Sequence, residues 1–335
     1  MLGGKTFPIL ITIRGSHAYG MAAESSDIDI GGIYLAPVED LLGITGNTKG
    51  EIKDKEVFVG LIKKLPNETY KERAYRNGIE GVCYELKKFL TLAMQCNPNM
   101  LEILFCKKAD VVYSSHLGED LRDFAHKFLS MRAISAYIGY AYQQLKRIET
   151  HRGWLFNPLK EKPSRLSFGL DEHKSELPPD QLKALGLIKE AELSNWVYPE
   201  KIEIVKQETA YISAKKNWDR YASWLENRNA ERAELESKFG FDLKHASHLI
   251  RLLRSVKDLL RYGELEVFRW DADYLTEIRN GIYSYQEVMD EAELLLKDIK
   301  ELGDVNHPKL PKEPDTEFIN DWCIEVYNSW IRTWA

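Results

Sequence analysis

The stretch from Arg14 to Gly32, RGSHAYGMAAESSDIDIGG, constrains the fold of this chain most. It follows an apolar run, Phe7–Ile13 (FPILITI), whose β-branched residues favour a buried strand. The Gly-Ser pair after that run allows a sharp turn, and the serine hydroxyl is expected to cap a short helix over 17–23. Apolar residues then alternate over Asp27–Leu35, which predicts a second strand. We therefore expect a strand, a corner, a short helix and a strand that opens with two aspartates.

Three better-known motifs are excluded because each lacks a required residue. The spacing of Gly15 and Gly20 suits a phosphate-binding loop, but Met21 stands where that loop needs lysine. An EF-hand is excluded because Gly31 occupies the ligand position that follows Asp29. A hydrolase nucleophile elbow would need a second glycine that the stretch does not have.

The remaining pattern suits nucleotide and metal chemistry. Asp27 and Asp29 are two residues apart on the expected strand, so their carboxylates lie on one face and can share divalent cations. Two oxygen-ligated Mg²⁺ ions, or Mn²⁺ in their place, can activate a hydroxyl and stabilise a leaving pyrophosphate. Gly15 and Ser16 are expected at a helix N-terminus, where backbone N–H groups favour the phosphates of a nucleotide. Together the four residues predict a site for an NTP and its metal ions.

The stretch resembles a known family. GSHAYG followed by SDIDIGG is similar to the GS…DxD signature of the polymerase-beta nucleotidyltransferase superfamily. Two further blocks, YELKKFLTLAMQCNPNMLEILF and FDLKHASHLIRLLRSVKDLLRYGELEV, look like the RNA repair pathway polymerase-beta family, whose members are predicted nucleotidyltransferases of bacteria and phages. The resemblance covers residues 10 to 300, least well in the proline-rich middle. It implies a magnesium-dependent nucleotidyltransferase that uses an NTP such as ATP.

The resemblance also implies a third carboxylate on a later strand. Glu80 is our choice as catalytic residue and metal ligand, because it lies on a short apolar strand just ahead of a helix over 84–95. Glu85 is the rival, although it is expected to open that helix, where an acidic residue meets the dipole favourably. Glu56 is a more distant alternative, and an ordinary solvated glutamate is the competing interpretation of Glu80.

The helix expected over 242–262 has two faces. Its apolar residues recur at helical spacing, and Lys244, His248 and Arg251 lie together on another face. A solvated basic stripe is the ordinary meaning of such a face. The resemblance adds the alternative that these three residues bind the phosphates of the triphosphate or of RNA. A metal site at His245 and His248 is not favoured, since no carboxylate or cysteine joins them in this block.

Composition limits the partners. The 46 basic and 52 acidic residues give a net charge of −6, so contact with nucleic acid must come from local basic patches, such as the cluster at 146–152. The four cysteines form no CxxC pair, which favours a reducing cytoplasm. We expect neither a signal peptide nor a membrane span, because no apolar stretch approaches the roughly 20 residues that a membrane helix needs.

The alternation of strands and helices up to about residue 113 predicts an α+β protein with a polymerase-beta-type core, a mixed sheet flanked by helices. We place this core at 1–115 and a mainly helical domain at 116–335, with an irregular, proline-rich connection at 153–200. Within the core, 57–62 and 100–105 are expected as strands and 64–78 as a polar loop. Beyond the core we expect helices at 117–150, 180–190, 202–237, 242–262, 284–302 and 315–333.

These observations predict an enzyme that transfers NMP from an NTP to a hydroxyl acceptor. The family name and the basic patches favour an RNA acceptor, at its 3′ end and with tRNA as one candidate. The acidic net charge leaves open a protein acceptor, as in toxin and antitoxin nucleotidyltransferases. A third hypothesis, an inactive nucleotide-binding scaffold on the same fold, is disfavoured by the intact GS and DxD residues.

Overall fold

The computed structural model describes residues 6–44, 50–173, 175, 177, 202–303 and 310–334. Contacts divide the chain into two compact units, Met1–Ile148 with Leu243–Ala335, and Glu149–Asp242. The first unit thus combines the N-terminal half with the C-terminal helices. The predicted domain boundary after residue 115 stays a prediction.

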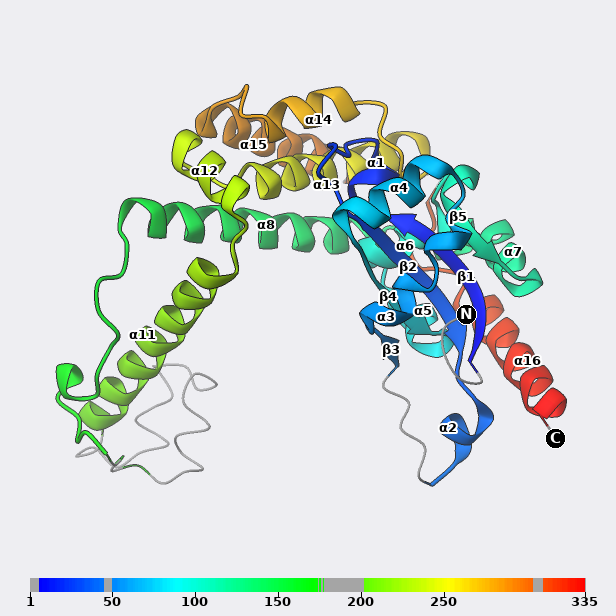
Figure 1. The fold of residues 1–335 in the computed structure, drawn as a ribbon, viewed down its shortest axis with the longest axis horizontal. Helices are drawn as coiled ribbons and strands as arrows, with labels where there is room; N and C mark the ends of the chain where they lie inside the picture. The colour runs from blue at the N-terminus through cyan, green and yellow to red at the C-terminus, as the bar shows by residue number, and fades with distance from the viewer. Residues whose placement is uncertain are drawn as a thin grey trace. The chain divides into compact units, whose positions relative to one another are not determined.

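A five-stranded mixed sheet forms the centre of the first unit (Figure 1). Its strand order in the described residues is β3-β4-β2-β1-β5. β2 is antiparallel to β1 and parallel to β4, and β3 and β5 run antiparallel to their neighbours. This sheet with its flanking helices confirms the predicted α+β fold of polymerase-beta type. The strands are β1 Phe7–Arg14, β2 Ile28–Leu35, β3 Glu51–Ile52, β4 Ile79–Glu85 and β5 Val111–Ser114.

These strand directions place three strand ends at one edge of the sheet. β2 and β4 begin at this edge, because they are parallel and Asp29 pairs with Glu80. β1 ends there, since Arg14 pairs with Asp29 in the antiparallel direction. β3 runs toward this edge antiparallel to β4, but its two residues pair with Cys83 and Tyr84, near the opposite end of β4. Residues that start or follow these strands therefore gather along one line.

The helices around the sheet bury its apolar side chains. Ile11 and Ile13 of β1 and Ile28 and Ile30 of β2 lie in a core with Phe58 that excludes almost all solvent. None of the described helices has the length and apolar character needed to cross a membrane. The helices up to residue 128 are α1 Gly15–Tyr19, α2 Val38–Leu42, α3 Lys55–Val59, η1 Ile62–Lys64, α4 Glu68–Asn77, α5 Leu86–Ala93, α6 Pro98–Leu104, η2 Lys108–Asp110, α7 His116–Asp123 and η3 Ala125–Phe128.

Three predictions in the core are wrong. Residues 57–62 and 100–105 fall mainly in helices α3 with η1 and α6 rather than in strands, and the expected polar loop at 64–78 contains α4. Each of the three helices begins after an Asp or Asn that accepts a backbone N–H, namely Asp54, Asn67 and Asn97. A satisfied N-cap stabilises a first helical turn, and Pro98 at the start of α6 adds a preset backbone angle. These caps outweigh the β-branched content on which the strand predictions rested.

The C-terminal helices complete the first unit. The predicted apolar face of α13 is buried, and α13 packs against α14 and α15. α16 returns to the sheet, where the Trp330 indole donates a hydrogen bond to the carbonyl oxygen of Ala36 over 2.9 Å. The segment at 117–150, expected to be helical, is divided among α7, η3 and α8. The later helices are α8 Arg132–Phe156, α13 Leu243–Tyr262, α14 Ala272–Arg279, α15 Tyr285–Gly303 and α16 Thr316–Trp334.

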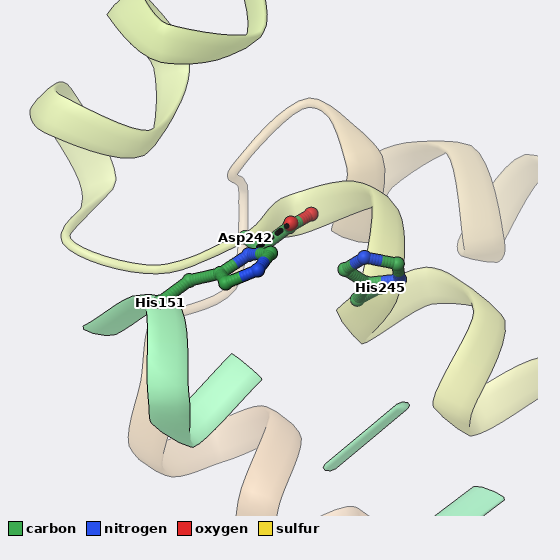
Figure 2. A group of neighbouring side chains, drawn as sticks. All are labelled: His151, Asp242 and His245. Atoms are coloured by element: carbon green, nitrogen blue, oxygen red, sulfur yellow. Dashed lines mark hydrogen bonds and ion pairs between the residues drawn. The ribbon is translucent and has the colours of Figure 1, made fainter. Parts of the chain in front are cut away.

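The second unit contains η4 Leu166–Phe168, α11 Ile202–Asn227 and α12 Ala230–Phe239, after the end of α8. The helix predicted at 180–190 and most of the proline-rich connection lie outside the described residues. His151 and Arg152, from the predicted basic cluster, are used inside this unit. Figure 2 shows the imidazole of His151 beside the Asp242 carboxylate, with Nδ1 and Oδ2 3.1 Å apart. Arg152 donates to the carbonyl oxygen of Gly240 over 2.8 Å.

Candidate active site

Three carboxylates converge at the strand edge of the first unit. Asp27 immediately precedes β2, Asp29 lies at its start, and Glu80 lies opposite Asp29 on β4. One oxygen from each of the three side chains lies within 4.8 Å of the other two. The predicted third carboxylate thus lies with the two aspartates, although it is about 50 residues away in sequence.

The charges of this cluster oppose one another. Burial, together with the neighbouring carboxylates of Asp27 and Glu80, raises the pKa of Asp29 to about 6, whereas Arg14 and Lys244 act in the opposite direction. A divalent cation would offset this repulsion and would also balance the negative charges that are costly to bury. Three carboxylates with close oxygen atoms are a donor set that fits Mg²⁺ or Mn²⁺.

The corner after β1 is shaped around Asp29. Gly15 has a φ of +65°, and a Cβ placed on it would lie 2.0 Å from the Asp29 Oδ2 atom. Only glycine fits both the backbone angle and the space. Helix α1 begins at Gly15, with Arg14 at the cap position and no side-chain cap bond, so the prediction that Ser16 caps a helix over 17–23 is wrong. The Ser16 hydroxyl, half-buried, is therefore not used by a helix cap.

The rival carboxylates have other surroundings. Glu85 is buried at the cap of α5, where it accepts the N–H of Lys87 and the hydroxyl of Tyr327. Glu56 is exposed in the first turn of α3. Neither belongs to the carboxylate cluster of the described residues.

A buried ionic network behind the site was not predicted. Glu102 of α6 accepts the Tyr19 hydroxyl over 2.6 Å and the Arg251 guanidinium over 3.0 Å. A second guanidinium, that of Arg14, lies 3.7 Å from Glu102 and donates to the Asn99 side chain over 3.1 Å. The role of Glu102 was not predicted, because the apolar pattern of residues 100–105 indicated a strand. The available signal was the Asn-Pro start of α6, which turns residues 99 and 102 toward one face.

The three predicted cationic residues of α13 lie in different surroundings. Lys244 is exposed, and its charge reaches Asp29. Arg251 is 6 % exposed, with its guanidinium 3.8 Å from the ring centre of Tyr19 and paired with Glu102. The ring of His248 meets Tyr19 edge-on at 6.0 Å, and burial, with Arg251 and Lys244 nearby, lowers its pKa well below the usual value. His248 is therefore a neutral imidazole at neutral pH, and Lys244 is the charge that α13 brings to the carboxylates.

The connection between α13 and α14, and the end of α14, also hold the segment from the end of α1 onward. The backbone N–H of Arg269 donates to the carbonyl oxygen of Tyr19 over 3.1 Å, and the Arg279 side chain donates to that of Met21 over 3.2 Å. His245 points elsewhere: its Nδ1 lies 2.7 Å from the side-chain oxygen of Gln144 (His245 is drawn in Figure 2). The C-terminal helices thus fix the position of the segment that carries Gly15 and Asp27.

Residues 7–157 match the model of the RNA repair pathway DNA polymerase beta family. This match confirms the resemblance read from the GS…DxD residues. An uncharacterized 38.9 kDa protein of Enterobacteria phage T4, from the nrdC–mobD intergenic region, is 23% identical over 344 residues, which is 93% of this chain and 95% of that protein. No solved structure matches the chain.

A cavity of about 450 Å³ opens beside the carboxylates of this polymerase-beta-type core. Asp29 and Glu80 lie in its wall together with Gly15, so two of the three predicted metal ligands and the corner residue face a common space. Two basic side chains from one other segment, Lys53 and Lys55, complete one part of the wall. The cavity can therefore admit a substrate to the carboxylate cluster.

Proposed function

We propose that this protein is a Mg²⁺-dependent nucleotidyltransferase that transfers NMP from an NTP to a hydroxyl of RNA. The acceptor is the 3′ end, with tRNA as one candidate, and the reaction takes place in the cytoplasm. The observation that carries the proposal is the convergence of Asp27, Asp29 and Glu80 beside the Gly15 corner. The family match over residues 7–157 supports it.

Asp27, Asp29 and Glu80 would hold two Mg²⁺ ions, or Mn²⁺. Bound there, the metal would lower the pKa of the acceptor hydroxyl and stabilise charge on the leaving pyrophosphate. The crowding of the three carboxylates supports this assignment, because a bound cation would offset the repulsion that Asp27 and Glu80 exert on Asp29.

The other residues act on the nucleotide. Gly15 gives the triphosphate close access to the backbone, and the Ser16 hydroxyl and Lys244 bind its phosphate oxygens. The acceptor oxygen then bonds to the α-phosphorus while the bond from that phosphorus to pyrophosphate breaks. The hydroxyl proton passes to Glu80 and on to water. His248 and Arg251 support the site indirectly, because both pack against Tyr19, the last residue of the helix that begins at Gly15.

The test is transfer of label from each α-labelled NTP to total RNA with Mg²⁺. Wild-type protein should label RNA, and Asp27→Asn and Asp29→Asn should each reduce the rate by at least about 100-fold. Asp120→Asn, at an exposed aspartate of α7 in the same unit, is the matched control and should retain wild-type activity. Unchanged transfer by the double variant of the two site aspartates would refute the mechanism.

Digestion of the labelled product identifies the acceptor. Label that ribonuclease releases and protease does not supports RNA. The reverse result would replace RNA with a protein hydroxyl and keep the chemistry. A protein that shows neither transfer nor a thermal shift with NTP and Mg²⁺ would be an inactive scaffold, contrary to the proposal.

A further inference from the structure

The strand edge has a defined order. From the sheet order, the residues along it run from Gly15 after β1, to Asp29 on β2, to Glu80 on β4, and Lys53, just after β3, lies beyond β4 and back from the edge, because β3 pairs with Cys83 and Tyr84. The carboxylates therefore lie between the glycine corner on one side and the β3–α3 connection on the other. All of these residues line the 450 Å³ cavity.

This order gives the reaction a direction. In a phosphoryl displacement, the attacking oxygen and the leaving oxygen lie roughly in line on opposite sides of the phosphorus. With the triphosphate at Gly15, as in the proposed function on which this step rests, pyrophosphate leaves toward β1. The acceptor hydroxyl must then approach from the side of Glu80 and the β3–α3 connection.

Two lysines line the wall on that side, in a segment that also carries Glu51, Asp54 and Glu56. Lys53 and Lys55 are exposed and line the cavity, whose floor is formed in part by the apolar side chains of Phe58 and Val82. Lys55 has no ion pair among the described residues. Lys53 contacts Glu51, but that carboxylate also pairs with Lys88 at 2.8 Å, so the group of three carries a net positive charge.

The two lysines beside the carboxylates favour an acceptor that carries phosphate groups, because the lysines can bind these groups. A protein hydroxyl presents no negative charge next to the reacting oxygen, whereas each terminal nucleotide of a polynucleotide has a phosphate a few bonds away. Exposed lysines bind such phosphates as point charges. Of the charged residues at 51–56, only Lys53 and Lys55 line the cavity, so the positive charge on this side comes from these two side chains.

We propose that Lys53 and Lys55 form the acceptor subsite, which binds the phosphates next to the terminal hydroxyl of a single-stranded RNA. The lysines place this hydroxyl on the Glu80 side of the α-phosphate. The subsite selects RNA over protein by charge and reads no particular base.

The test compares Lys53→Ala/Lys55→Ala with Lys63→Ala/Lys64→Ala, a matched pair of exposed lysines at η1. Binding of a fluorescent single-stranded oligoribonucleotide is measured by anisotropy at several salt concentrations, without nucleotide. The affinity of the first variant should be lower by about 10-fold or more. Its negative slope of log K against log salt should become shallower by about 1.4, the value expected for the loss of two phosphate contacts. Lys53→Arg/Lys55→Arg should restore the binding, and the η1 variant should bind as wild type.

Kinetics separate this inference from the proposed function. The Lys53/Lys55 alanine variant should raise the KM for RNA about 10-fold or more and leave the KM for the NTP within about twofold. If wild-type protein transfers nucleotide to RNA but both lysine variants bind RNA equally well, the subsite is wrong and the proposed function stands. If the label goes to protein, both the subsite and the RNA acceptor are wrong. If the wild type binds RNA but transfers no nucleotide, and the Lys53/Lys55 alanine variant loses that binding, the subsite is supported and the transfer reaction is refuted.

Discussion

Replacement of Asp29 by Asn should stabilise the metal-free protein at neutral pH. Burial and the charges of Asp27 and Glu80 raise the pKa of Asp29 from 3.8 to about 6. The folded state therefore binds its proton more tightly than the unfolded chain does. The stability from this effect is fully present below pH 3.8 and is lost as the pH rises toward 6. Above pH 6 the wild type pays the full cost of an ionised, crowded carboxylate, and the amide of the variant does not.

The size of the effect follows from the pKa. A change from 3.8 to about 6 corresponds to at most about 3 kcal/mol, at about 1.4 kcal/mol per pH unit. Asp29 is half-buried, so solvent screening reduces this to about 1–3 kcal/mol. For a folding unit of this size the melting temperature should rise by roughly 2–10 °C. Asp29 has no side-chain hydrogen bond to lose in the part of the chain that is described.

Calorimetry or a dye-based melt in EDTA, from pH 3.5 to 8, measures the difference between variant and wild type. The two proteins should melt together near pH 3.5 and separate between pH 4 and 6, with the variant more stable above that range. Asp120→Asn should follow the wild type at every pH. Equal or lower stability of Asp29→Asn at pH 7.5 in EDTA would show that the carboxylates do not repel one another as their positions require.

Three further outcomes are expected. Added Mg²⁺ should raise the melting temperature of wild-type protein and leave that of Asp29→Asn within about 1 °C, because the variant lacks a central ligand. Gly15→Ala should lower kcat by at least about 100-fold in a single-turnover assay, since its Cβ would lie 2.0 Å from the Asp29 oxygen. Glu102→Ala should lower the free energy of unfolding by about 3–5 kcal/mol in urea titrations, because it leaves the buried guanidinium of Arg251 without its carboxylate. A change below 1 kcal/mol there would mean that water or another group takes over the charge.

The missed helices show which sequence signals were strongest. Short apolar runs at 57–62 and 100–105 favoured strands, and the residues ahead of them favoured helices. Asp54 and Asn97 each accept a backbone N–H of the first helical turn. In a strand, that N–H group would need a neighbouring strand as its hydrogen-bond partner. Short apolar runs are compatible with either structure, so the cap decides.

The local pattern of residues by itself determined the strand-corner-strand segment with Asp27 and Asp29, and the buried face of α13. Periods of 2 and 3.6 residues and the turn residues are properties of adjacent positions, and no distant contact is needed to establish them. The tertiary structure alone decided the partners across the fold. The register between β2 and β4 sets Glu80 beside Asp29. Packing turns Arg251 inward to Glu102 while Lys244 stays exposed near the carboxylates. These choices depend on the pairing of strands and helices far apart in sequence, where a shift of one residue would turn a side chain to the opposite face.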